Sequence, residues 1–235
     1  MYQQLKGLIL RGQVSAEADK LITIYTYEWG KISAIVPGAK KIVAKLSAAT
    51  EPVVETDLML YVSSPRARPK VTGAVLLGHF PGLRQQWRRF VAAQTCAEIT
   101  DVLTPYNAEN PQKYELLART WQYLESAQYP WRIVMAFTLR FLKLSGYSFV
   151  DYLQREHSLI PPGQQQLIKK MATLPGDEVD RCLTIEEDVE QELKRHVDNY
   201  LSLHLTRPLG TRKFWQQHSN MCSAFANENE QKVIK

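Results

Sequence analysis

The side chains with the clearest chemical role in this sequence are basic residues grouped in its first seventy positions. No acidic residue lies between Glu28 and Glu51, an interval that holds four lysines, and three further cations fall between positions 66 and 70. Cations grouped in this way neutralise phosphates and release counterions, so they indicate binding of a polyanion rather than catalysis. The predicted nucleic-acid contacts are Lys31, Lys40, Lys41, Lys45, Arg66, Arg68 and Lys70. A solvated basic surface without a ligand is the alternative interpretation.

A second group of cations falls on one face of a predicted helix over residues 131–145. Arg132, Arg140 and Lys143 recur at helical spacing in a segment that is otherwise almost entirely apolar. Cations beside an apolar groove suit a short peptide that carries both acidic and hydrophobic groups. The residues predicted to wall such a groove are Trp131, Val134 and Phe137. The alternative is that the three cations face water while the rest of the helix packs.

The motifs of the common enzyme classes are absent from the sequence. It contains no phosphate-binding glycine loop, dinucleotide-binding fingerprint, nucleophile elbow or zinc-protease helix motif. Glu192, His196 and His204 recur along one predicted helix, but no further ligand cluster accompanies them. The three cysteines are widely spaced and odd in number, which argues against a disulfide framework and a paired-cysteine zinc site. We therefore predict a protein that is not an enzyme and that holds no metal or other cofactor.

The elements that must position the first group of cations have the pattern of a small β-barrel. Runs rich in β-branched and aromatic residues alternate with turn signals. These runs cover residues 5–12, 22–27, 31–36, 53–62 and 70–77, and a short helix is expected within 41–49. Five strands with a helix between the third and the fourth match an oligonucleotide-binding (OB) barrel, whose last hairpin connection often touches nucleic acid. Tyr27 and Trp29, near the tip of a predicted hairpin, would either stack on bases or fill the barrel core.

The β pattern stops at residues 79–82, and the rest of the chain has helical periodicity. Asn110 and Pro111 supply an N-cap and a first-turn proline, and Thr184 begins a capping-box pattern ahead of the last long helix. We predict an α+β protein: an OB-fold nucleic-acid-binding domain over residues 1–80 and a helical domain over 81–235. Within the second domain, residues 150–183 have a weak pattern and are expected to be irregular, with a short helix over 164–173.

Composition indicates a globular protein with an anionic partner. Apolar residues make up 45% of the chain, enough for a core, and the net charge is +5. Residues 1–80 carry ten Lys and Arg against six Asp and Glu, so the barrel holds much of the excess. No apolar run reaches membrane-spanning length, and the first residues lack a signal-peptide pattern, so a cytoplasmic location is expected. Charge alone fits DNA and RNA equally.

Several segments of the sequence resemble the bacterial recombination mediator family RecO. The segment over 17–41, EADKLITIYTYEWGKISAIVPGAKK, has the most specific pattern. The others are LKGLILRG, YELLARTWQYLE, FLKLSGY and YLSLHLTRPLGTRKFW. The resemblance implies an OB-fold joined to a helical domain, binding and annealing of single- and double-stranded DNA, partnership with RecR, and loading of RecA onto DNA coated by single-strand binding protein. It also implies a nucleoid-associated location and a site for the acidic, hydrophobic C-terminal tail of single-strand binding protein, for which Arg132, Arg140 and Lys143 are the predicted cations.

One feature of that family is missing from the sequence. Many members hold a four-cysteine zinc element between the helix that ends near Gly146 and the last long helix, whereas this interval contains only Cys182. Because a structural zinc site normally needs four ligands, we predict that the zinc element has been lost. An OB-fold protein that binds RNA is the alternative to the DNA-binding interpretation, and an enzyme with a site in the helical half is disfavoured by the missing motifs.

Overall fold

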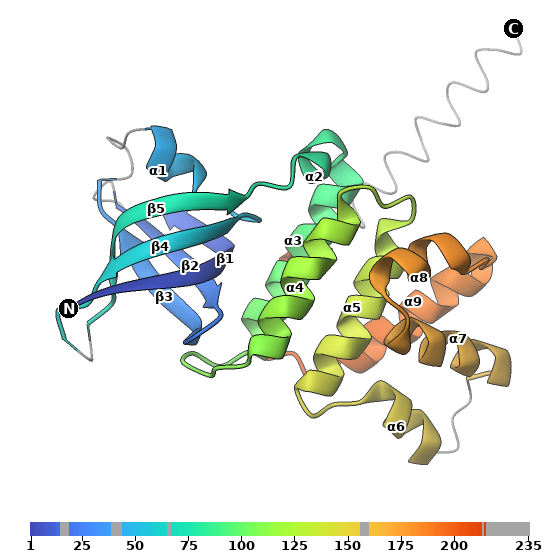
Figure 1. The fold of residues 1–235 in the computed structure, drawn as a ribbon. Helices are drawn as coiled ribbons and strands as arrows, with labels where there is room; N and C mark the ends of the chain where they lie inside the picture. Colours follow the sequence, from blue (N-terminus) through green and yellow to red (C-terminus); the bar gives the residue numbers. More distant parts are fainter. Residues whose placement is uncertain (15–18, 39–43, 65–66, 156–159, 213, 215–235) are drawn as a thin grey trace, which may run out of the picture.

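The fold consists of a β-barrel followed by a body of helices (Figure 1). The computed structural model describes residues 1–235 except 15–18, 39–43, 65–66, 156–159, 213 and 215–235. The barrel part comprises β1 (Tyr2–Val14), β2 (Lys20–Thr26), β3 (Gly30–Val36), α1 (Ala44–Ala48), β4 (Glu55–Tyr61) and β5 (Lys70–Gly78). The helical part comprises α2 (Pro81–Gln85), α3 (Trp87–Leu103), α4 (Pro111–Leu124), α5 (Pro130–Leu144), α6 (Phe149–Arg155), α7 (Pro162–Thr173), α8 (Gly176–Cys182) and α9 (Glu187–Ser202).

The described strands close into a ring in the order β1-β2-β3-β5-β4. Neighbours are antiparallel except β3 and β5, which pair in parallel at Ile35 and Lys70. The interior is filled because alternate strand residues point inward, among them Ile9, Ile24 and Leu58, each fully buried. The predicted α+β class and the five-stranded barrel, with α1 between β3 and β4, are confirmed.

The outer face of β1, β2 and β3 packs on the helical body. Leu8, Leu10 and Tyr25 point away from the barrel interior and belong to the same buried cluster as Phe80 and Trp121. The main chain joins the two parts as well, since Asn107 N donates to Lys31 O over 2.9 Å. Gly30 has a φ of 65°, and a Cβ there would collide with the carbonyl of Ala108. The barrel is therefore held against the helices through one whole side.

The helices surround α5, which is buried along nearly its entire length. Asn110 caps α4, its side chain accepting from Lys113 N over 3.1 Å as the sequence predicts. The last long helix departs from prediction: α9 begins at Glu187, and its N-cap residue Glu186 makes no side-chain cap bond. In place of a capping box, three acidic residues in its first turn interact favourably with the positive end of the helix dipole.

The short helix predicted over residues 164–173 corresponds to α7, but the expectation that the rest of residues 150–183 is irregular is wrong. This interval contains most of α6 and all of α7 and α8, which form a second buried cluster with α5 and α9. Ile168, Met171 and Val179 are fully buried there against Met135 and Leu193. Each helix contributes only a few buried residues, so its apolar stripe is too short to stand out as a period in the sequence.

Candidate nucleic-acid and peptide interfaces

The connection between β4 and β5 presents cations to solvent. Arg68 and Lys70 are exposed, and neither takes part in an ion pair within the described residues. Of the other predicted phosphate contacts, Lys45 lies in α1, while Lys40, Lys41 and Arg66 lie outside the described residues. The structure thus leaves two predicted cations open to a polyanion at this end of the barrel.

The structure corrects the prediction that Lys31 contacts phosphates, because this residue is buried. The residue as a whole is 5% exposed, and its ammonium donates to the backbone oxygen of Asp101 over 2.5 Å and lies 3.3 Å from the carboxylate. The ammonium also lies 4.5 Å from the centre of the Tyr106 ring. The Asp101 carboxylate also forms ion pairs with Arg11 Nε at 3.0 Å and with Arg207 Nη2 at 3.1 Å. Lys31 therefore joins β3 to α3 and is withdrawn from the predicted phosphate contacts.

The two aromatic residues of the β2–β3 hairpin lie in different surroundings. Tyr27 is 40% exposed and meets Tyr114 edge to face, with ring centres 5.6 Å apart. Tyr114 is fixed in turn by donating to Glu55 over 2.9 Å. Trp29 is partly buried and packs against the barrel interior, and its backbone amide donates to Thr26. Trp29 thus contributes to the barrel core, whereas Tyr27 lies at its junction with α4.

The structure also corrects the prediction that Arg132 contacts a bound peptide. Arg132 is 5% exposed and donates to Glu190 over 2.6 Å, to Leu183 O over 2.7 Å and to Ile185 O over 3.3 Å. Its guanidinium stacks on the Tyr129 ring at 3.9 Å. These bonds fasten the segment before α9 to α5, so the guanidinium is already used within the protein. Arg132 therefore has a structural role here.

The other members of the basic stripe do not gather into a groove. Arg140 is half-buried, donates to the backbone oxygens of Ala172 and Met171 at the end of α7, and has its pKa lowered by burial. Lys143 is exposed. Phe137 is buried against Phe141, with ring centres 5.3 Å apart, so it belongs to the core and not to a groove wall. Arg132 and Arg140 thus face α7, α9 and the segment before α9, contacts that the sequence of α5 alone does not reveal.

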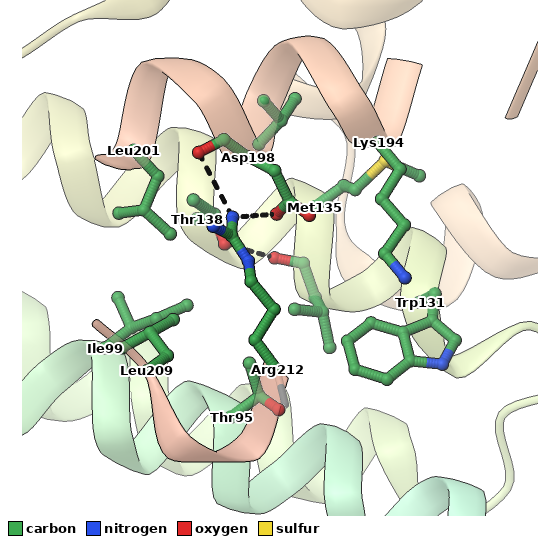
Figure 2. A pocket seen from close by; sticks show the side chains of 12 residues that line it. Thr95, Ile99, Trp131, Met135, Thr138, Lys194, Asp198, Leu201, Leu209 and Arg212 are labelled. Carbon is green, nitrogen blue, oxygen red and sulfur yellow. Dashed lines mark hydrogen bonds and ion pairs between the residues drawn. The ribbon is translucent and has the colours of Figure 1, made fainter. Parts of the chain in front are cut away.

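On another face of α5 there is a pocket, which lies between α3, α5, α9 and the segment that follows α9 (Figure 2). About 430 Å³ of space, partly open to solvent, lies between its side chains. Trp131 and Val134, both predicted as groove walls, line it. The other lining residues are Thr95, Ile99, Met135, Thr138, Lys194, Val197, Asp198, Leu201, Leu209 and Arg212. We call this the α5–α9 pocket.

Two cations that the sequence analysis did not select stand at the α5–α9 pocket. The Lys194 ammonium lies 4.5 Å from the centre of the Trp131 ring. Its pKa is lowered, because the effect of burial exceeds the opposite effect of Asp198. Arg212 pairs with Asp198 at 2.8 Å and donates to Ser202 over 3.0 Å, as Figure 2 shows for the first contact. An apolar depression with cations at its edge suits a ligand that combines a bulky apolar group with a carboxylate. The pattern of the α5 sequence could not reveal Lys194 and Arg212, because both lie far from α5 along the chain.

The described part of the chain contains no helix that is both long and apolar enough to cross a membrane. Within the same residues, no three His, Cys, Asp or Glu side chains come together in a way that would hold a metal ion. Cys96 is buried and Cys182 is exposed, each as a free thiol.

Comparison with known proteins gives matches over both parts of the fold. A family model described as "Recombination protein O N terminal" matches residues 1–80, and one described as "Recombination protein O C terminal" matches residues 84–150. A curated relative from Gloeothece citriformis is 36% identical over 129 residues, which cover 54% of this chain and 44% of the relative. One from Heliobacterium modesticaldum is 34% identical over 143 residues, covering 60% and 50%.

A longer alignment comes from Oceanobacillus iheyensis, at 24% identity over 176 residues, covering 75% of this chain and 66% of the relative. All three relatives bear the name DNA repair protein RecO. The chain spans half or less of the length of the first two relatives it matches.

Proposed function

The chain belongs to the recombination protein O (RecO) family, and from that premise we propose that it is a non-enzymatic DNA-binding mediator of recombinational repair. In this role it would bind and anneal DNA in the cytoplasm and, with RecR, help RecA load onto DNA coated by single-strand binding protein. The observation that carries the proposal is the exposure of Arg68, on the β4–β5 connection, and of Lys70, at the start of β5, neither of them in an ion pair within the described residues of a barrel that a RecO family model matches.

The physical case for DNA rests on charge. Lys70 begins β5 and Arg68 lies two residues before it, and Figure 1 shows the start of β5 at the end of the barrel away from the helical body, so a nucleic-acid strand can approach there without displacing a packed element. Each phosphate contact made by such a cation releases bound counterions, which gives affinity with little sequence preference. The other predicted phosphate contacts remain proposals of the same kind. In the sequence they lie between β3 and β4 or close to Arg68, and they are Lys40, Lys41, Lys45 and Arg66.

An OB-fold that binds RNA is the second candidate, because phosphate contacts do not distinguish the two nucleic acids. Competition binding of single-stranded DNA against RNA of equal length tests the choice. We expect DNA to displace RNA, and the protein to accelerate annealing of complementary DNA strands. Preference for RNA, or the absence of annealing, would contradict the proposed function.

We propose further that the α5–α9 pocket receives the C-terminal tail of single-strand binding protein. Such a tail presents aspartates, a terminal carboxylate and a bulky apolar side chain. The walls formed by Trp131 and Val134 would take the apolar group, and the cation at Lys194 would take the carboxylate. Arg132 and Arg140 are excluded from this role because their guanidiniums bond to Glu190 and to backbone oxygens.

A further inference from the structure

The face through which OB barrels usually meet nucleic acid is covered in this protein. That face is centred on the second and third strands. Here the outward residues of β2 and β3 include Thr23, Tyr25 and Lys31, which are 3%, 0% and 5% exposed. Tyr25 packs among helical residues and Lys31 bonds to Asp101 of α3. A nucleic acid must therefore use another side of the barrel.

The side formed by β1, β4 and β5 is open. Figure 1 shows these three strands with no described helix in front of them. Strand pairing sets their outward residues in three rows across the sheet. The rows are Tyr2, Tyr61 and Lys70; Gln4, Met59 and Gly73; and Lys6, Asp57 and Val75. We call this the β1–β4–β5 face.

Aromatic and apolar groups on this face are exposed to an unusual degree. Tyr2 is 66% exposed and Tyr61 is 38% exposed, and their rings lie 5.2 Å apart with a tilt of 53°. On the same face, Met59 in the next row is 52% exposed and Val75 in the third row is 64% exposed. Large apolar groups gathered on one surface usually mark a binding site. Gly73, in the middle row, is partly buried because the Met59 side chain packs against it, so Met59 forms the surface at this point of the face.

From this arrangement we infer that the Tyr2–Tyr61 pair is a stacking platform for unpaired bases of single-stranded DNA. The inference rests on the proposed DNA binding and assigns the unpaired strand to the β1–β4–β5 face. Every base has a π-face, so an exposed tyrosine ring can stack on any of them without reading sequence. The tilted ring pair leaves its outer ring surfaces to the solvent, where a base can lie.

Charge on the same face selects a polyanion over an apolar protein partner. Lys70 is the cross-strand neighbour of Tyr61, Lys6 lies two residues along from Gln4, and Arg68 precedes β5; all three are exposed. The acidic residue of the face, Asp57, accepts from Gln4 Nε2 over 2.6 Å, which partly occupies its carboxylate. Bases on the tyrosines would thus place the backbone of the strand within reach of cations on either side.

The test measures binding of a fluorescent oligothymidylate to the full-length protein and to Tyr2→Ala and Tyr61→Ala variants. Each alanine variant should lose roughly five- to a hundredfold in affinity, because stacking of one base on an aromatic ring contributes in that range. Tyr61→Phe should bind like the parent protein, since its ring remains. Tyr147→Ala is the matched control: Tyr147 is 44% exposed but lies in the helical part.

A strand of equal length without bases, and a DNA duplex, separate stacking from other effects. Both should bind the alanine variants as they bind the parent, because neither offers an unpaired base. Equal losses on the abasic strand, or unchanged affinity for oligothymidylate, would overturn the platform while leaving DNA binding intact. If the parent protein bound no DNA, the proposed function would fail first. Tyr61→Leu, which keeps apolar contact with Tyr2 but removes the ring, replaces Tyr61→Ala if that variant does not fold by circular dichroism.

Discussion

Lys31 of β3 and Asp101 of α3 form a buried ion pair between the barrel and the helical body, with 3.3 Å between Nζ and Oδ1 and both side chains 7% exposed. Arg11 of β1 and Arg207, which follows α9, converge on the same carboxylate. One acidic residue therefore connects the barrel, the longest described helix and the segment after α9. Loss of this carboxylate is costly because the Lys31 ammonium would be left buried without a counter-charge.

We predict that Asp101→Ala destabilises the protein more than Lys31→Met. Loss of the carboxylate leaves the buried ammonium uncompensated and should lower the free energy of unfolding by about 3–5 kcal/mol. Lys31→Met leaves Asp101 with Arg11 and Arg207, so the loss should be about 1.5–3 kcal/mol. Urea unfolding measures both. Arg119→Ala, which breaks an exposed pair with Glu115 at 3.7 Å, is the control and should change little. Equal losses for the two buried sites would contradict this account of Asp101.

A second prediction uses salt dependence to separate exposed from buried cations. Arg68→Ala or Lys70→Ala should each lower the slope of log affinity for DNA against log salt by about one, if each side chain contacts one phosphate. Lys31→Met should leave the slope unchanged, because its ammonium is bonded within the protein. Anisotropy titrations over a range of salt concentrations give the slopes. A smaller slope for Lys31→Met would mean that Lys31 reaches DNA after all.

A third prediction concerns Arg132 as a structural residue. Arg132→Ala removes three bonds to Glu190, Leu183 and Ile185 and should cost about 3–5 kcal/mol of stability, as is usual when one partner of a buried ion pair is lost. Lys143→Ala, on the same helix but exposed, should unfold like the parent protein. Thermal unfolding compares the two. Equal midpoints would return Arg132 to the solvent-facing interpretation.

These corrections show what the sequence can and cannot predict. Alternation within strands and the Asn110 cap are local patterns, and they were sufficient for the barrel and for the start of α4. Lys31 follows the same alternation and points outward, but the outer side of β3 happens to pack on α3. Nothing in the residues near Lys31 reveals that contact, because its partner lies 70 positions away.

The peptide site illustrates the same limit. Two of the residues that the α5 sequence offered as groove walls, Trp131 and Val134, line the α5–α9 pocket, whereas Phe137 does not. The same sequence also offered Arg132, whose acidic partner Glu190 lies 58 positions later in the chain. The cations that do stand at the pocket, Lys194 and Arg212, come from α9 and the segment after it. Tertiary contacts between distant segments, rather than local pattern, decide which charges stand at the pocket.

A fourth prediction tests the α5–α9 pocket with a synthetic acidic peptide that ends in an aromatic residue and a free carboxylate. Lys194→Ala should weaken binding about tenfold or more, since a hydrogen bond to a charged group contributes about 1.5–3 kcal/mol. Trp131→Ala should also weaken binding through loss of the apolar wall. Lys143→Ala is the control, because Lys143 lies on α5 but does not line the pocket. Calorimetric titration measures all three, and a peptide with an amidated end should bind weakly to each. Unchanged affinity for Lys194→Ala would place the tail elsewhere.

The last prediction is that the affinity for the tail peptide falls with rising pH, and that the fall begins at a lower pH than it would for a lysine with an ordinary pKa. Burial lowers the pKa of Lys194 from its ordinary value near 10.5, although Asp198 and Glu190 oppose that shift. The protonated ammonium, present below this pKa, is the form that attracts the carboxylate. As pH rises through the lowered pKa, the charge and its contribution to affinity are lost, while the carboxylates of the peptide stay ionised.

Bound carboxylate should in turn raise the pKa of Lys194, so binding at alkaline pH should take up a proton. Calorimetry in buffers of different ionisation enthalpy detects that proton. Lys194→Arg keeps its charge at every accessible pH, so its affinity should stay flat over the alkaline range and its binding should take up no proton. A parent protein whose alkaline profile matched that of Lys194→Arg would show that the ammonium at Trp131 does not hold the carboxylate.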